Sequence, residues 1–90
     1  MKVRYSRKAL KFLSKLDAKS VERIRDAIAG LTEKPPRGDI KPMQGYSDDR
    51  MRLRVGGWRV VYRLERDGRV EILRVMEIGN RAAIWRILGF

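Results

Sequence analysis

Arginine occupies every second position from Arg50 to Arg54 and returns at Arg59 and Arg63 after a pair of glycines. A guanidinium group is planar, always charged and able to hold a phosphate through two parallel hydrogen bonds. Side chains two positions apart in a β-strand lie on the same face of the sheet. This spacing predicts a sheet face that gathers guanidinium groups and binds phosphate.

The glycine pair Gly56-Gly57 decides which arginines oppose each other, because a two-residue turn fixes the register of the strands that it joins. Arg54 then faces Arg59. In the same register, Arg50 faces Arg63. Opposed like charges cost up to ~1 kcal/mol per pair, so an anion that bridges them is expected. Arginine as a merely soluble filler of an exposed sheet face is the alternative, and for one strand it is an equally good one.

A second turn is predicted at Asp67-Gly68, which would place Arg74 on the same face near Val61. Apolar groups interrupt this face, so part of it should be covered, with the C-terminal segment as the expected cover.

The amino-acid composition excludes several kinds of catalytic and metal-binding group. The 90 residues contain no cysteine and no histidine, which removes thiolate and imidazole as nucleophile, base or metal ligand. Lysine and arginine number 22 against 11 acidic residues, for a formal net charge of +11, and such a field attracts polyanions. Nucleic acid is the expected partner; a solvated cationic surface or an acidic protein partner would also account for the charge. We expect no metal and no cofactor.

The elements that must position these arginines follow from periodicity. Residues Lys2 to Tyr5 alternate as a strand, and Ser6 and Asp17 are good N-caps for two amphipathic helices joined almost directly. A loop rich in proline and glycine follows from Glu33 to Asp49. Three strands linked by tight turns come next: residues 51–55, 58 to about 65, and 70 to about 77.

The predicted fold class is therefore α+β: an N-terminal strand and a two-helix antiparallel hairpin packed on a mainly antiparallel four-stranded sheet, with a short C-terminal segment. At this length residues 1–90 form one domain. No apolar run is long enough for a membrane span or a signal peptide, so a soluble, cytoplasmic protein is expected.

The element order, the stretch from Arg50 to Tyr62 that reads RMRLRVGGWRVVY, and the ending Ile78-Gly-Asn-Arg81 followed by Trp85 resemble the RelE/ParE toxin superfamily over essentially the whole chain. Similarity to its RelE branch implies a toxin of a type II toxin–antitoxin system. Such a toxin is a metal-independent endoribonuclease that enters the ribosomal A site, cleaves mRNA by attack of the ribose 2′-hydroxyl, inhibits translation and is held in check by a cognate antitoxin protein.

The resemblance also assigns residues. Arg59 and Arg81 match arginines that stabilise the phosphorane, while Arg50 and Arg52 match basic residues that contact or activate the substrate. The remaining basic side chains of the face and one aromatic side chain are predicted to bind RNA: Arg54, Arg63, Arg74 and Trp85.

Two departures bear on mechanism. Some relatives carry lysines where Arg50 and Arg52 stand, and arginine does not act as a base, so the arginines acidify the 2′-hydroxyl electrostatically, or water or a ribosomal group takes the proton. Trp85 stands where well-studied relatives carry tyrosine. Indole stacks on a base or closes the core but cannot act as a phenolic acid.

Two other functions fit the sequence. The ParE branch shares the fold, poisons DNA gyrase and does not depend on a basic catalytic cluster, so the density of arginines argues against it. A non-catalytic RNA- or ribosome-binding domain would use the same arginines only as phosphate clamps.

Overall fold

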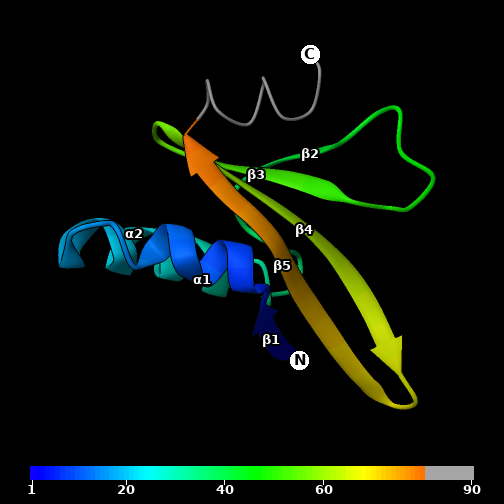
Figure 1. The fold of residues 1–90 in the computed structure, drawn as a ribbon. Coiled ribbons are helices and arrows are strands. Elements are labelled where there is room, and N and C mark those ends of the chain that lie inside the picture. Colours follow the sequence, from blue (N-terminus) through cyan, green and yellow to red (C-terminus); the bar gives the residue numbers. More distant parts are fainter. Residues whose placement is uncertain (81–90) are drawn as a thin grey trace.

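A five-stranded sheet with two helices on one face makes up residues 1–80, the part of the chain that the computed structural model describes (Figure 1). The elements in chain order are β1 (Lys2–Tyr5), α1 (Arg7–Leu13), α2 (Ala18–Gly30), β2 (Asp39–Pro42), β3 (Met51–Val55), β4 (Trp58–Asp67) and β5 (Val70–Asn80). None of the helices among these residues is long and apolar enough to span a membrane.

The sheet has the strand order β1-β5-β4-β3-β2, antiparallel except for β1, which pairs in parallel with β5. The α+β class and the order of helices and strands are confirmed. The predicted count of four strands is wrong by one, because residues inside the expected loop form β2 at the edge of β3. Four residues with a terminal proline give too short an alternation to be recognised in the sequence, and Pro42 suits an edge position.

The predicted turn at Gly56-Gly57 is confirmed, and Gly56 alone of the two takes a positive φ, 57°. The register follows as expected: Arg54 faces Arg59 and Arg52 faces Val61. The pairing of β3 with β4 begins at Met51, so Arg50 lies just before the strand.

The second turn lies one residue later than predicted, at Gly68-Arg69, because Asp67 still pairs with Val70. A β-bulge between Val61 and Tyr62 shifts the register again. Arg74 therefore faces Arg63 rather than Val61, and Glu77 takes the place opposite Val61. The expectation that Arg74 lies on the same face as Arg63 still holds, since directly opposed side chains share a face.

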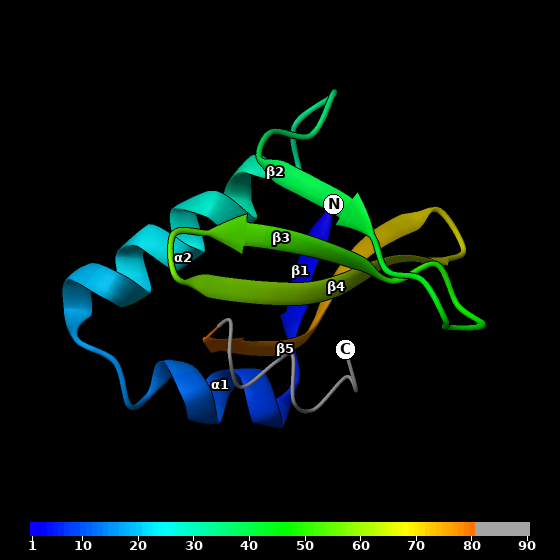
Figure 2. The same ribbon diagram turned by 90° about the horizontal axis from the view of Figure 1, so that it is seen from above.

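Both helices begin at the predicted caps. The Ser6 hydroxyl accepts a hydrogen bond from the Ala9 N–H at 3.0 Å and donates one to the Met76 carbonyl at 2.6 Å, so the same residue caps α1 and ties it to β5. The Asp17 carboxylate caps α2 by accepting from the Ser20 N–H at 3.3 Å. The helices run in roughly opposite directions across the sheet (Figure 2).

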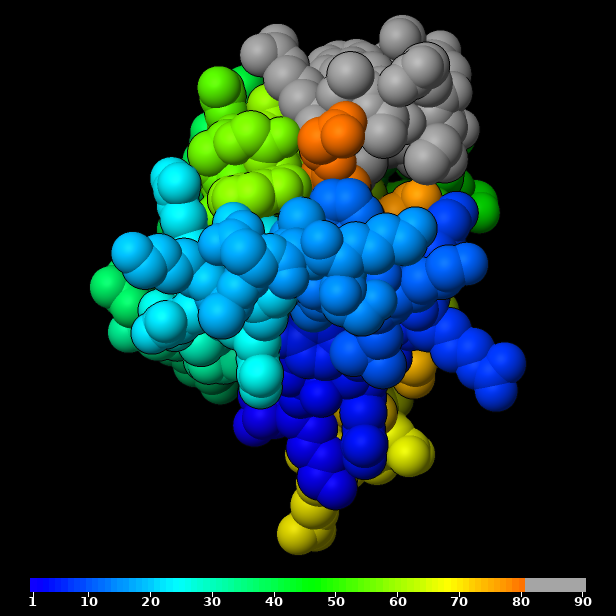
Figure 3. All heavy atoms as spheres, turned by 60° about the vertical axis from the view of Figure 1, so that its left-hand side comes forward, coloured from blue at the N-terminus to red at the C-terminus, as the bar shows by residue number. Residues whose placement is uncertain are grey.

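The core lies between the helices and one face of the sheet. Ile24 and Ile28 of α2 are buried against strand residues such as Leu53, Val60 and Leu73, each at most 1% exposed. Seen from the helix side, the blue and cyan helices cross the middle of the molecule, and the tip of the β4–β5 hairpin extends below them (Figure 3). The opposite face of the sheet carries the side chains that alternate with this core.

Candidate nucleic-acid interface

The sheet face that points away from the helices is basic, and we refer to it as the arginine face. Residues that alternate with core positions along the strands place their side chains there. Its positively charged strand members among residues 1–80, with Arg50 just before β3, are Lys2, Arg4, Lys41, Arg50, Arg52, Arg54, Arg59, Arg63 and Arg74.

Arg50 and Arg63 meet at the carboxylate of Asp48. Nε and Nη2 of Arg50 donate to the two oxygens of Asp48 at 2.8 and 2.9 Å, and Nη1 of Arg63 donates to Oδ2 at 3.1 Å. The guanidinium of Arg50 also lies over the ring of Tyr46, 4.1 Å from its centroid. These contacts fix the planes of both guanidinium groups.

Glu65 joins the next pair of arginines along the face in the same way. Its carboxylate accepts from Nε of Arg63 at 2.6 Å and from Nε of Arg74 at 2.9 Å. Arg50, Arg63 and Arg74 thus form one chain of guanidinium groups held together by two carboxylates. The anion expected between opposed arginines is supplied by the protein's own side chains.

In this row of arginines and carboxylates, each partner shifts the pKa of the other. The hydrogen bond from Arg50 is the main cause that lowers the pKa of Asp48 to about 2. Hydrogen bonds from Arg74 and Arg63 lower the pKa of Glu65, and the same pairs raise the pKa of Arg50 and Arg63. Asp48, Glu65, Arg50 and Arg63 are therefore charged at neutral pH.

Arg59 differs from the others because its residue is only 4% exposed. Its Nη1 donates to the carbonyls of Trp58 at 3.0 Å and Gly56 at 3.3 Å, so part of its hydrogen bonding holds the β3–β4 turn. Arg59 and Arg63 are four residues apart, about 13 Å along an extended strand. The predicted site residues therefore fall into two groups, one at the turn and one at the carboxylates, rather than over a single point.

Strand β2 adds groups that the sequence predicts to lie in a loop. Lys41 pairs with Arg52, and Asp39 pairs with Arg54. Nη2 of Arg52 lies 3.5 Å from Oδ1 of Asp39, so this arginine too has a carboxylate neighbour. Arg52 occupies the middle of the face, between the turn group and the carboxylate group.

The parallel pairing of β1 extends the face on the other side. Arg4 lies opposite Arg74, so one row of arginines crosses from β4 over β5 to β1. Neighbouring strands are about 4.8 Å apart, a spacing short enough for a row of side chains to follow a phosphate backbone. The sequence predicts the strand but not its neighbour, because the pairing joins residues about seventy positions apart in sequence.

Glu77 and Lys8 complete the face at its open edge. Nζ of Lys8, in the first turn of α1, lies 3.0 Å from Oε1 of Glu77, which faces Val61. This pair adds a further carboxylate and a further amine at the edge of the arginine face. Arg81 and Trp85, the remaining predicted site residues, lie outside the described residues, as does the C-terminal segment expected to cover part of this face.

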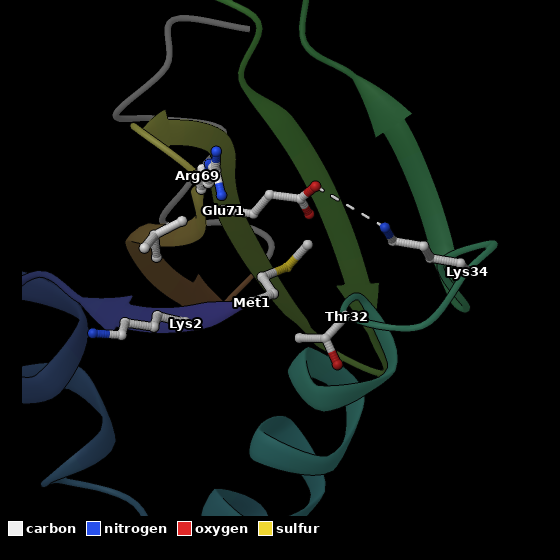
Figure 4. A pocket seen from close by; sticks show the side chains of 7 residues that line it. Met1, Lys2, Thr32, Lys34, Arg69 and Glu71 are labelled. Carbon is white, nitrogen blue, oxygen red and sulfur yellow. Dashed lines mark ion pairs between the residues drawn. The ribbon is translucent and has the colours of Figure 1, made fainter.

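A pocket of about 500 Å³ lies elsewhere, beside the N-terminus and the β4–β5 hairpin (Figure 4). Lys34 and Glu71 point toward each other in it, with Nζ and Oε1 4.0 Å apart. None of the predicted site residues lines it. Within residues 1–80 no cluster of three histidine, cysteine, aspartate or glutamate side chains is placed to hold a metal ion.

The Asp48 contacts predict a pH dependence. A carboxyl group whose pKa falls from 3.8 to about 2 on folding adds stability above pH 3.8, and that stability is lost as the pH falls toward 2. We expect wild type to lose more stability than Asp48→Asn over this interval, measured by urea unfolding at each pH. The other carboxylates are the same in both proteins, so their contributions to the loss of stability cancel in the comparison. Equal losses by the two proteins would contradict the lowered pKa of Asp48.

Comparison with known proteins agrees with this architecture. Residues 3–80 match the family described as ParE toxin of type II toxin-antitoxin system, parDE. No curated protein matches the chain in sequence.

Three solved structures share the fold. The YoeB/ParE toxin from Agrobacterium tumefaciens is 25% identical, with a TM-score of 0.74, covering 90% of this chain and 99% of that one. The isolated E. coli RelE toxin is 26% identical, with a TM-score of 0.63 and coverages of 96% and 97%. The archaeal RelE-RelB complex from Pyrococcus horikoshii OT3, at 24% identity and a TM-score of 0.70, covers 89% and 93% and supports the fold alone.

The family match spans all five strands and both helices, and its strand and helix arrangement is the one found in the solved toxins. The chain therefore belongs to the ParE toxin family of type II toxin–antitoxin systems, within the RelE/ParE toxin superfamily.

Proposed function

We propose that this toxin is a ribosome-dependent endoribonuclease that cleaves mRNA in the A site and so inhibits translation. The observation that carries the proposal is the convergence of Arg50, Arg63 and Arg74 on two carboxylates of the arginine face. Guanidinium groups that grip carboxylate oxygens in this way have the geometry that also grips phosphate oxygens.

The reaction suits a site made of arginines. The 2′-oxygen attacks the adjacent phosphorus, the bond to the 5′-oxygen breaks, and the products are a 2′,3′-cyclic phosphate and a 5′-hydroxyl. Charge builds up on the non-bridging oxygens in the transition state, where preorganised donors stabilise it most. In this proposal Arg50 and Arg52 contact the reacting phosphate, with Arg59 and Arg81 as the family arginines that stabilise the phosphorane.

Proton transfer needs other groups, since a guanidinium keeps its proton. Water or a ribosomal group can accept the proton of the 2′-hydroxyl while the arginines acidify it, and water or a ribosomal group likewise supplies the proton that the departing 5′-oxygen takes up. Glu77, opposite Val61 on the arginine face, adds a candidate acceptor within the protein. Arg54, Arg63, Arg74 and Trp85 would hold the RNA on either side.

The proposed partners are mRNA, the ribosome and a cognate antitoxin protein. Relatives of the same fold are solved as complexes with RelB. An antitoxin that covers the arginine face would neutralise it, and its complex with a chain of net charge +11 should weaken with added salt. A cytoplasmic location follows from this role.

Gyrase inhibition is the second candidate, because the matching family is described by its ParE toxins. Its target is DNA gyrase, so the arginine face would have no catalytic role. The clustering of arginines on β3 and β4, among them Arg52 with its carboxylate neighbour and the buried Arg59, is the observation that ranks it second.

One experiment separates these functions. The protein is added to a translation extract, and mRNA 5′ ends are mapped by primer extension; the same preparation is added to gyrase with supercoiled plasmid. We expect cuts within ribosome-bound codons and no trapped DNA cleavage. Trapped gyrase cleavage without mRNA cuts would establish the ParE-like activity, and salt-sensitive RNA binding with neither product would leave a non-catalytic binding domain.

A further inference from the structure

Asp48 makes a pair of contacts that resemble those of a bound phosphate. One guanidinium, that of Arg50, grips both carboxylate oxygens, and a second, that of Arg63, adds a bond to Oδ2 at 3.1 Å. A phosphate diester carries the same single charge and also offers two oxygens to such a fork. The two anions are therefore alternatives for one site.

The anion and the arginines belong to different segments of the fold. Arg63 is in β4 and Arg50 directly precedes β3, so the sheet fixes where both guanidinium groups start. Asp48 lies in the loop that joins β2 to β3, which is closed at its base by the Met43 N–H bound to the Arg50 carbonyl at 3.2 Å. Within that loop Gly45 takes a φ of 87°, a conformation that favours glycine.

Glu65 cannot change places as easily as Asp48. It lies within β4, where it pairs with Ile72 of β5, and is held by Arg63 and Arg74 together. Both carboxylate side chains are 25% exposed, so exposure does not distinguish them; Asp48 differs in that it lies in the β2–β3 loop, outside the strand pairings. Of the two carboxylates, Asp48 is the one that a ligand can replace.

We infer that Arg50 and Arg63 form a phosphate subsite that Asp48 fills in the free toxin, and that an RNA phosphate binds by displacing Asp48. This inference rests on the proposed function, because it takes RNA as the ligand. Exchange of one anion for another leaves the charge of the site unchanged, and the ligand must first release Asp48 from its three hydrogen bonds. Free RNA therefore binds weakly, whereas RNA presented at high effective concentration by the ribosome overcomes the competition.

The test uses a short fluorescent single-stranded RNA as the probe. We expect Asp48→Asn to bind it about five- to tenfold more tightly than wild type at moderate salt, because the subsite has lost its competing charge. Asp49→Asn is the matched control, since Asp49 is the exposed neighbour and its replacement changes the net charge equally. A larger gain in RNA affinity for Asp48→Asn than for Asp49→Asn would support the inference. Equal gains, or weaker binding by Asp48→Asn, would overturn it, the latter because Asp48 would then be orienting the arginines for RNA.

A second measurement needs no variant. The ¹³C resonance of the Asp48 carboxyl in wild type should shift as RNA saturates the protein, and an unmoved resonance in the saturated complex would also overturn the inference. Failure of the proposed function looks different: the RNA-binding gain would be present while translation extracts show no cuts. Cuts by wild type combined with equal binding by the two variants would remove the inference and leave the ribonuclease in place.

Discussion

Replacement of both Arg50 and Arg52 by alanine is expected to slow mRNA cleavage by the proposed ribonuclease about 100- to 1000-fold. Both side chains are 22% exposed, so they are partly shielded from water and still open to a ligand. Arg50 is oriented by two hydrogen bonds to one carboxylate, and Arg52 lies mid-face beside Lys41 and Val61. Their charges act on the non-bridging oxygens of the reacting phosphate. Single-turnover cleavage on programmed ribosomes measures the effect.

Replacement of both Lys19 and Arg25 by alanine is the matched control, because both residues are exposed on α2, on the other side of the sheet, and their loss also removes two positive charges. This variant should cleave at close to the wild-type rate. An Arg52→Lys variant keeps the charge without the planar fork and should retain some of the activity. If the double alanine variant cleaves like wild type, the arginine face has no catalytic role.

Local patterns make much of this site readable in the sequence. Ser6 and Asp17 are caps by residue type, and the glycine pair at 56–57 sets the register of β3 with β4. From that register the opposition of Arg54 and Arg59 follows without further information. Period-two alternation also places Glu65 on the same face as Arg63, two residues before it on the same strand. A search for positively charged residues alone would miss this carboxylate. The two-residue spacing of Glu65 from Arg63 is the signal that could have found it.

Non-local pairing explains what the sequence does not predict. β2 is four residues long and reaches the arginine face only because it pairs with β3. Arg4 reaches it through a parallel pairing with the last strand. A bulge, which inserts one unpaired residue, moves Glu77 to the position opposite Val61. None of these has a signature within its own segment, and each adds a charged group to the site.

The position of Asp48 could not be predicted either, because it lies in a loop. Its spacing of two residues from Arg50 is visible in the sequence, but a loop residue has no fixed face, so only the structure shows that it turns back to meet Arg63 as well. From the sequence, the opposed arginines predict an external anion. The structure shows an internal anion, the carboxylate of Asp48, in contact with two of them, and our inference is that an external anion competes with it.

Leu73→Ala is expected to destabilise the protein by about 2–5 kcal/mol, the range for deleting a fully buried leucine side chain. Leu73 is 0% exposed and lies in β5 within the core, directly before Arg74. The substitution removes apolar contact and leaves a cavity between the sheet and the helices. Urea unfolding followed by circular dichroism gives the change in the free energy of unfolding.

Leu64→Ala is an unusually close control, because Leu64 pairs directly with Leu73 across β4 and β5 but is 56% exposed. Because more than half of the Leu64 side chain is already exposed, the same substitution removes little buried surface and should cost less than about 1 kcal/mol. Similar losses at both positions would mean that Leu64 is covered in solution. A large difference would locate the stabilising contact at β5 rather than at β4, in the strand that carries Arg74 to the arginine face.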